Sequence, residues 1–407
     1  MSDALLPNYE LDASPGALTR PGGFKAGATT VGIKKSGLPD MAFLVSDDLA
    51  AAAAVFTSNA VRAAPLVVDA EHVADGKIRA VLVNSGNANA ATGERGIVDA
   101  RRMASIAGEC AGCQAEDAFV LSTGVIGQFM PMDLIEKGAQ TIAPTDSGGA
   151  EFARAIMTTD TFPKEASQTF EANGQRYTLG GCAKGAGMIH PNMATMLAFL
   201  TTDAPIEASL LEARLRLACD LSFNMISVDG DTSTNDTVLL LANGAGRGPS
   251  IAGDEAEQAF ATALESVCRK LAIDIARDGE GATKLIEMEV AGGATVEEAR
   301  AVARSVVRSP LLKAALSKGD PNWGRVLMAA GNAGVGFDPA QCRLSIGGIA
   351  LFANGAPTGV TESEAANTVT GKVVRIRLEL GRGEFAATAW GCDLTEEYVR
   401  FNADYVT

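Results

Sequence analysis

The chain has 407 residues, of which 47% are hydrophobic and 20% charged, and a formal net charge of −15. This length and composition predict a globular protein with a substantial core and more than one domain or subdomain. The negative charge argues against nucleic acid as a partner, because phosphate binding needs a basic face, and no run of 18 apolar residues is present to span a membrane.

The cysteines and histidines narrow the chemistry further. Seven scattered cysteines, and an N-terminus without the basic and apolar regions of a signal peptide, predict a cytoplasmic protein. Cys110 and Cys113 have C-x-x-C spacing but no second pair of ligands, so ordinary thiols are expected. With only His72 and His190, a Ser-His-Asp triad or a multi-histidine metal site has little to draw on. Catalysis would need another base, and a free α-amine with a pKa of about 8 is one.

The N-terminal half predicts alternating helices and strands. Residues 1–30 are rich in Pro and Gly and are expected to form an extended arm, and residues 47–55 a short alanine-rich helix. Further strands are expected at 79–83 and 119–121, and helices at 92–112, 132–142 and 149–155. Asn173-Gly174 predicts a β-hairpin between 169–172 and 175–178, because both residues tolerate positive φ.

The C-terminal half continues the alternation. Strands are expected at 196–200, 237–242 and 284–290, and helices at 207–221, 295–307, 309–317 and from about 395. Apolar residues from Phe260 to Ile275 recur at helical spacing and predict a long amphipathic helix. Asp320 is expected to cap a further helix with Pro321 at its first position. Strands 375–380 and 384–388 are expected to form a second hairpin around Gly381-Arg382-Gly383.

The stretch from 182 to 204 changes character at Thr195. Before Thr195 it is glycine-rich and predicts a constrained loop, and after it the residues are apolar and favour a buried strand. If the loop strains the Ala194–Thr195 peptide, the threonine hydroxyl can attack the preceding carbonyl. An N-to-O acyl shift then turns the peptide into an ester, and hydrolysis of that ester by water breaks the chain. Thr195 would become a new N-terminus whose hydroxyl lies beside its own amine, which is one way to activate a weak nucleophile.

Several other segments have both a chemical and a purely structural interpretation. Ser122-Thr123-Gly124, at a strand end, is either a simple turn or a source of donors to an oxyanion. The polar turn at 84–89 either faces a site or uses Asn and Gly for unusual dihedrals. Lys184 is either a surface lysine or a cation for a substrate carboxylate. Residues 229–240 superficially echo a calcium loop, but the twelfth position is Leu rather than Glu, so calcium is not expected.

These motifs together resemble the ornithine acetyltransferase family (glutamate N-acetyltransferase, of arginine biosynthesis). The stretch 182–204 is similar to the self-cleavage segment of that family. The other similar blocks are Val83 to Ala90, Ser122 to Gly127, Met157 to Thr161, Ser222 to Asp236, Asp320 to Arg325 and Asn402 to Thr407. The resemblance therefore runs from about residue 20 to the end of the chain.

The resemblance implies a fold and a set of site residues. The fold would be α/β, with sheets layered between helices as in the β-aminopeptidases, and self-cleavage between Ala194 and Thr195 would give chains 1–194 and 195–407. Thr195 would be the nucleophile, and Thr123 and Gly124 would stabilise the oxyanion. The implied substrate contacts are Thr158, Lys184, Thr195, Glu280, Asn402 and Thr407, of which Glu280 would otherwise be interpreted as a solvated turn acid.

The implied reaction moves an acetyl group from N2-acetyl-L-ornithine to L-glutamate by way of an acetyl-threonine ester, and needs no metal or organic cofactor. Some family members also accept acetyl-CoA, so the resemblance leaves a second donor open. It further implies α2β2 or larger assemblies. Two alternatives stay open: an N-terminal-nucleophile amidohydrolase, in which water takes the acyl group, and a non-catalytic small-molecule-binding protein that never cleaves.

Overall fold

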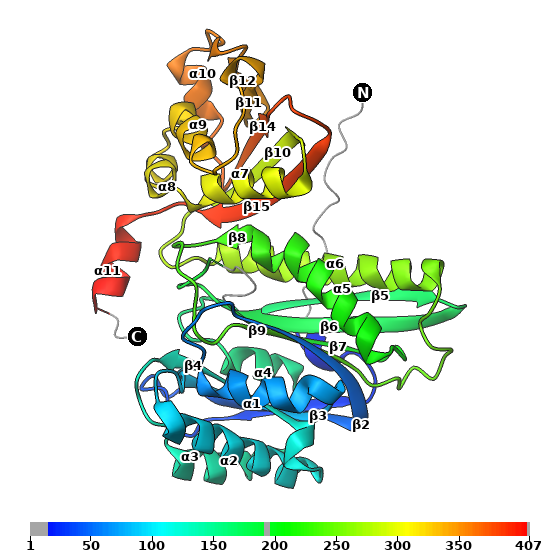
Figure 1. Cartoon of the computed structure of the whole chain (residues 1–407). Helices are drawn as coiled ribbons and strands as arrows, with labels where there is room; N and C mark the ends of the chain where they lie inside the picture. The colour runs from blue at the N-terminus through cyan, green and yellow to red at the C-terminus, as the bar shows by residue number, and fades with distance from the viewer. Residues whose placement is uncertain (1–14, 191–195, 405–407) are drawn as a thin grey trace.

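The computed structural model describes residues 15–190 and 196–404, and its helices and strands form layers around two sheets (Figure 1). The first sheet has eight strands in the order β4-β3-β2-β9-β7-β6-β5, with β1 paired to β2. Its strands are β1 (Phe24–Thr29), β2 (Met41–Phe56), β3 (Lys77–Asn87), β4 (Ala118–Val125), β5 (Lys164–Ala172), β6 (Gln175–Lys184), β7 (Leu197–Thr202) and β9 (Thr237–Ala242).

Helices cover both sides of this sheet. They are α1 (Ala64–His72), α2 (Gly93–Ala111), α3 (Met132–Ala139), α4 (Gly149–Ala155), α5 (Ala208–Leu221) and α6 (Asp254–Arg277). In Figure 1, α2 and α3 lie below the β2–β4 portion, and α5 and α6 lie above the β5–β7 portion. A buried core with Phe119 of β4, Phe152 of α4 and Phe199 of β7 fills the space between the two portions. The prediction of an α/β fold with sheets layered between helices is confirmed.

The helix expected over residues 47–55 is wrong, because this segment belongs to the 16-residue strand β2. The register with β3 shifts between Val45 and Ala50, and the pairing with β3 continues to Ala51. From Ala51 to Phe56, β2 pairs with β9. Alanine favours helices locally, but here the small side chains allow α5 to pack closely on the strand. Tertiary packing therefore overrides the local preference.

The extended arm expected for residues 1–30 is also wrong in part. Phe24–Thr29 forms β1, which pairs antiparallel with β2 from Phe24 opposite Ser46 to Thr29 opposite Met41. The first hairpin, by contrast, is confirmed: β5 and β6 pair in register, and Asn173 and Gly174 at the turn have φ angles of 52° and 71°. That hairpin leads directly to Lys184 at the end of β6.

The second sheet has seven strands in the order β13-β12-β11-β14-β10-β15-β8. These are β8 (Ile226–Ser227), β10 (Leu285–Gly293), β11 (Arg343–Ile346), β12 (Ile349–Ala353), β13 (Ala356–Pro357), β14 (Val373–Glu379) and β15 (Phe385–Cys392). Its helices are α7 (Val296–Arg308), α8 (Pro310–Ser317), α9 (Trp323–Gly331), α10 (Glu362–Asn367) and α11 (Glu396–Asp404). One continuous hydrophobic core joins this sheet to α5 and α6.

The second hairpin is wrong, although both of its strands exist. β10 lies between them, parallel to β14 and antiparallel to β15. The connecting turn instead crosses the end of β10, where the N–H groups of Arg382 and Gly383 donate to the carbonyl of Gly292. The alternating pattern of the two strands fits a central partner as well as it fits a hairpin, so the sequence pattern could not separate the two pairings.

The cap expected for α9 is wrong as well. Asn322 caps the helix, since its side chain accepts a hydrogen bond from the Arg325 N–H at 3.2 Å. Asp320 lies two residues earlier and accepts from the backbone and side-chain nitrogens of Asn322, each at 2.9 Å. Pro321 therefore precedes the helix and does not begin it.

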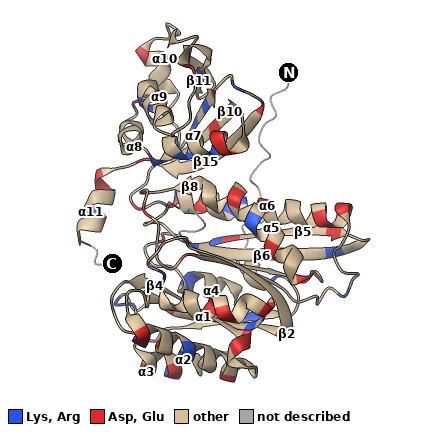
Figure 2. Ribbon diagram, in the orientation of Figure 1, with Lys and Arg blue, Asp and Glu red and all other residues tan. Residues whose placement is uncertain are grey.

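Charge and hydropathy complete this description. Figure 2 shows Asp and Glu on helices of both the first and the second sheet, in agreement with the negative net charge. Among the residues that the structure describes, no helix combines the length and apolar character needed to cross a bilayer. Within the same residues, no group of three His, Cys, Asp or Glu side chains is placed to hold a metal ion.

Candidate active site

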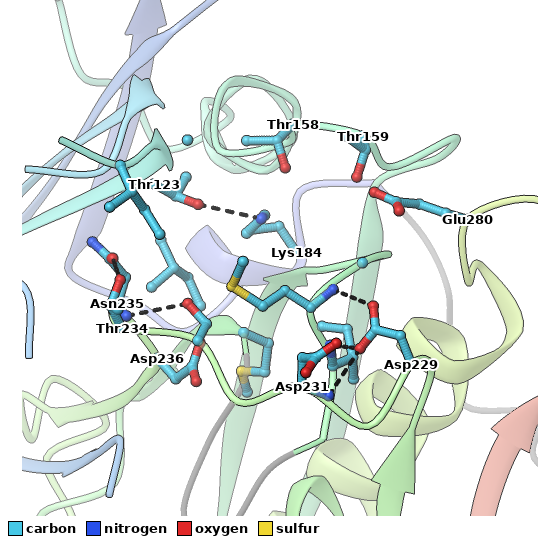
Figure 3. Close-up of a pocket in the computed structure, with 18 of the residues that line it drawn as sticks. Thr123, Thr158, Thr159, Lys184, Asp229, Asp231, Thr234, Asn235, Asp236 and Glu280 are labelled. Carbon is cyan, nitrogen blue, oxygen red and sulfur yellow. Dashed lines mark hydrogen bonds between the residues drawn. The ribbon is translucent and has the colours of Figure 1, made fainter. Parts of the chain in front are cut away.

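A cavity of about 210 Å³ opens where the ends of β4 and β6 and the start of β7 meet the segment 229–236 and α11 (Figure 3). It brings together six of the residues predicted from the sequence, namely Thr123, Gly124, Thr158, Lys184, Glu280 and Asn402. Ala194, Thr195 and Thr407 lie outside the described residues. Met196 and Leu197, which follow Thr195 in the chain, line the cavity.

The chain is anchored on both sides of residues 191–195. Before them, the carbonyl of His190 accepts a hydrogen bond from the Thr232 hydroxyl at 2.8 Å. After them, the carbonyl of Met196 accepts from the Thr237 N–H at 2.9 Å. The two ends are thus held by the segment that runs from the cavity wall into β9.

Lys184 lies inside the molecule and is not a surface lysine. It is 8% exposed, and its Nζ donates to the Thr123 hydroxyl oxygen at 3.3 Å. Burial lowers the pKa of Lys184, and the nearby carboxylate of Asp160 opposes that change. Since the Lys184 ammonium fills a lone pair of the Thr123 oxygen, the Thr123 O–H remains able to donate to a third group.

Gly124 is required by the close approach of β4 to β3. Its φ is +132°, and a Cβ at this position would lie 2.4 Å from the carbonyl carbon of Gly86. The Asn235 side chain fixes the same place, donating to the carbonyls of Ala88 and Ser122 at 2.6 and 2.8 Å. Backbone packing and the Asn235 hydrogen bonds therefore hold the end of β4, which carries Thr123 and Gly124, in place.

The polar turn at 84–89 supports the cavity from behind. The Asn84 amide donates to the Asn87 carbonyl at 2.9 Å and accepts from the Ser122 hydroxyl at 2.7 Å. None of residues 84–90 lines the cavity. Of the two interpretations of this turn, the structural one is confirmed.

A buried charge network under the cavity was not predicted from the sequence. The Lys164 ammonium contacts Asp160 at 2.7 Å and Asp278 at 2.6 Å, and the three side chains are at most 3% exposed. Asp160 also accepts from the N–H groups of Thr158 at 3.0 Å and Gly185 at 2.6 Å. The network therefore joins the three segments that carry Thr158, Lys184 and Glu280.

The ionisation of this network follows from its contacts. Burial alone would raise the pKa of Asp160, but the Lys164 and Lys184 charges and the hydrogen bonds outweigh it and hold that pKa well below its usual range. In the sequence, Asp160 stands out only as a member of the block Met157 to Thr161. The available signal was an acidic residue four positions before Lys164, but this spacing does not reveal that both side chains are buried.

Glu280 and Asn402 meet across two distant parts of the sequence. The Asn402 amide of α11 donates to the Glu280 carboxylate at 2.8 Å. A Cβ at Gly187 would lie 2.4 Å from the carboxyl group of Glu280, so a larger residue there would displace that carboxylate from its present position. Figure 3 shows Thr123 and Glu280 on opposite sides of Lys184. The cavity thus places the Lys184 side chain between the Thr123 hydroxyl and the Glu280 carboxylate.

The segment 229–236 forms another wall of the cavity. Asp229 accepts from the N–H groups of Met188 and Ile189 at 2.6 and 2.8 Å, and from the Tyr398 hydroxyl at 3.3 Å. Met188 has a φ of +56°, so Asp229 holds an unfavourable backbone conformation in place. Burial raises the pKa of Asp236 well above its ordinary value.

An α/β fold with a polar cavity shared by loops from both sheets defines an enzyme-like protein with a small-molecule site. The profile of the ArgJ family matches residues 25–407. The arginine biosynthesis bifunctional protein ArgJ of Dehalococcoides mccartyi is 48% identical over 395 residues, covering 96% of this chain and 98% of the relative. The protein of the same name from Symbiobacterium thermophilum is 50% identical over 397 residues, covering 96% and 99%. The chain therefore belongs to the ArgJ family, which confirms the resemblance found in the sequence.

Solved structures are similar over part of the chain. ArgJ from Bacillus halodurans is 43% identical with a TM-score of 0.43, covering 45% of this chain and 96% of that chain. Ornithine acetyltransferase from Mycobacterium tuberculosis, in complex with ornithine, is 36% identical with a TM-score of 0.41, covering 46% and 97%.

Proposed function

We propose that this chain transfers the acetyl group of N2-acetyl-L-ornithine to L-glutamate, as a glutamate N-acetyltransferase of arginine biosynthesis. The observation that carries the proposal is the convergence of Thr123, Lys184 and Glu280 on one cavity that Met196 also lines. The family membership and the name of the curated relatives, arginine biosynthesis bifunctional protein, support it.

In the proposed mechanism the chain first cleaves itself between Ala194 and Thr195, giving pieces 1–194 and 195–407. The Thr195 hydroxyl then attacks the acetyl carbonyl carbon of the donor while its proton passes to the free Thr195 amine. The C–N bond breaks, the amine of ornithine takes up the proton and leaves, and acetyl-Thr195 remains. The amine of glutamate attacks this ester, releases N-acetylglutamate and restores the hydroxyl, which completes a ping-pong cycle.

The cavity supplies groups suited to each charge that forms. The Thr123 hydroxyl, already accepting from Lys184, and the Gly124 N–H would donate to the oxyanion; losing one such donor commonly costs about 3 kcal/mol of transition-state stabilisation. Lys184 would bind a substrate carboxylate, and Glu280 a substrate amine. The other proposed substrate contacts are Thr158, Thr195, Asn402 and Thr407.

The remaining parts of the proposal concern donors, assembly and compartment. No metal or organic cofactor is required, because the ester itself stores the acetyl group. Acetyl-CoA is proposed as a second donor, in line with the word bifunctional in the names of the relatives. The two pieces would assemble as α2β2 or a larger oligomer and act in the cytoplasm, where the seven unpaired cysteines would stay reduced.

The mass of the purified protein under denaturing conditions, with N-terminal sequencing, tests the cleavage. Two chains, one beginning Thr195-Met196-Leu197, are expected in place of a single chain of 41.8 kDa. Thr195→Ala should remain one chain and show no transfer from N-acetylornithine to glutamate. Substantial transfer by that variant would remove Thr195 from the mechanism. Release of acetate at the same rate with and without glutamate would instead indicate an amidohydrolase.

A further inference from the structure

A second cavity, of about 250 Å³, lies apart from the catalytic one and shares no lining residue with it. It is formed where α6 and the end of α5 face β10, β15 and the start of α7, at the junction of the two sheets. Figure 1 shows α6 directly beneath β15 and α7. Ligand sites often lie at such junctions, where a few polar groups converge between apolar walls.

The polar groups of this cavity that lack partners are hydrogen-bond donors. Arg300 forms no hydrogen bond or ion pair with any described residue, and its charge reaches Glu297 only over a longer distance. Arg269 pairs with Glu265 through its Nη2, but its Nε–H is buried without an acceptor. The hydroxyl of Thr388 also has no partner among the described residues.

The acid in the lining does not compensate these donors. Glu289 also lines the cavity, but its carboxylate is already paired with Arg377 at 2.5 Å. A buried N–H without an acceptor is unfavourable, and an acceptor atom from a ligand would remove that cost. In a chain with a net charge of −15, a cavity lined by two arginines, in which the one lining acid is paired with Arg377, is a specific local feature.

The rest of the lining is apolar and well ordered. Met225 and Val296 contribute aliphatic surface, and Trp390 contributes its indole ring. The indole is held in place because its Nε1 donates to Glu287 at 3.2 Å. A ligand that fits these donors and walls joins a carboxylate to a short aliphatic body.

We propose that this cavity binds a small organic carboxylate, with Arg300, the Arg269 Nε–H and the Thr388 hydroxyl contacting the carboxylate and Trp390 packing against the apolar body. Arg–carboxylate pairing is the strongest class of contact that these groups can make. The inference does not depend on the proposed acetyl transfer, since none of its residues belongs to the catalytic cavity.

The chain offers a local probe for this site. It contains two tryptophans. Trp323 does not line this cavity and instead stacks on Phe352 of β12, with ring centroids 5.6 Å apart. In a Trp323→Phe background, Trp390 is the remaining indole and reports on the cavity by its fluorescence. Succinate is the probe ligand, and its neutral diamide, succinamide, is the matched control.

Saturable change of Trp390 emission by succinate, but not by succinamide, is the expected result. Arg300→Gln should weaken succinate at least about tenfold, whereas Arg343→Gln, which removes the same charge from an exposed position on β11, should leave the affinity unchanged. Thr388→Val serves as a second variant, with a smaller loss, if Arg300→Gln proves poorly folded by circular dichroism.

Two results would overturn the proposal. One is the absence of a saturable response at millimolar succinate in the folded Trp323→Phe protein. The other is a response that Lys184→Met loses and Arg300→Gln keeps, because that pattern would place the anion in the catalytic cavity.

Discussion

Replacing Asp160 by Asn tests whether the buried network positions the segments that are proposed to bind substrate. The change keeps the shape of the side chain and removes its charge. Asp160 accepts three hydrogen bonds, from Lys164, Gly185 and Thr158, through both of its oxygens. Asparagine has one acceptor oxygen, so at least one of these contacts is lost and an N–H₂ group faces a donor.

The cost follows from the burial of this network. Removing one partner from a buried ion pair typically costs about 3–5 kcal/mol, because the other charge is left uncompensated. Lys164 keeps Asp278 as a partner, so the lower end of that range is expected for the free energy of unfolding. The native pKa of Asp160 is depressed, so its contribution is present above the pKa of the unfolded carboxyl. The difference between the two proteins should therefore narrow as the pH falls below about 4.

We expect Asp160→Asn to change the activity through its effect on the pKa of Lys184. The Asp160 charge opposes the lowering of the Lys184 pKa by burial, so its removal lets that ammonium lose its proton at lower pH. Lys164, Asp236, Glu280 and the ammonium of Lys34 also act on this group. We expect a higher KM for N-acetylornithine, and a loss of kcat/KM on the alkaline side that begins at lower pH than in the unaltered protein.

Urea unfolding and a pH profile of acetyl transfer would measure both effects. Asp48→Asn, which removes an exposed carboxylate, is the matched control and should change neither. If Asp160→Asn unfolds with the stability of the unaltered protein and its alkaline limb does not move, the network has no positioning role and the reasoning fails.

Three further substitutions test other parts of the structure. Gly124→Ala should lower kcat by at least about 100-fold, because the close approach at that strand end leaves no room for a Cβ; Gly127→Ala, where φ is also positive but the space is open, should retain most of the activity. Glu280→Gln should raise the KM of the amine-bearing substrate about 10- to 100-fold in steady-state assays, and an unchanged KM would remove Glu280 from binding. Asp69→Asn should raise the free energy of unfolding at pH 8 by about 1–3 kcal/mol, since burial raises the pKa of Asp69 and its folded form resists ionisation. That gain should shrink as the pH falls toward 4, and denaturant unfolding at the two pH values would show whether it does.

Local patterns in the sequence predicted most elements but not their partners. The long amphipathic helix from its apolar spacing, and the first hairpin from Asn173-Gly174, are confirmed because their signals are contained within each segment. The alanine-rich stretch in β2 is a strand, and β14 pairs with β10, because of the elements that pack against them. Those elements are distant in the sequence, so local patterns do not reveal them. The expected second hairpin failed for the same reason.

The candidate site, too, could be predicted only in part from the sequence. Thr123, Lys184, Glu280 and Asn402 were assigned through resemblance, and the structure places them in one cavity. The buried charges beneath them could not be predicted, because no local pattern distinguishes Asp160 from a solvent-exposed acid. Burial depends on how the layers pack together, which a short stretch of sequence does not show. It makes Asp160 a residue whose replacement is expected to affect the site.

The topology also bears on how a cleaved chain would hold together. The second sheet comes entirely from residues after 195, but the first sheet is shared: β6 pairs with β7, and β2 pairs with β9, across the proposed cut. Every residue of β7 and β9 is buried. Pieces 1–194 and 195–407 are therefore not independent folding units, because separating them would break two central strand pairings and expose the core between them. The proposed cut between Ala194 and Thr195 would therefore leave both strand pairings of the first sheet intact.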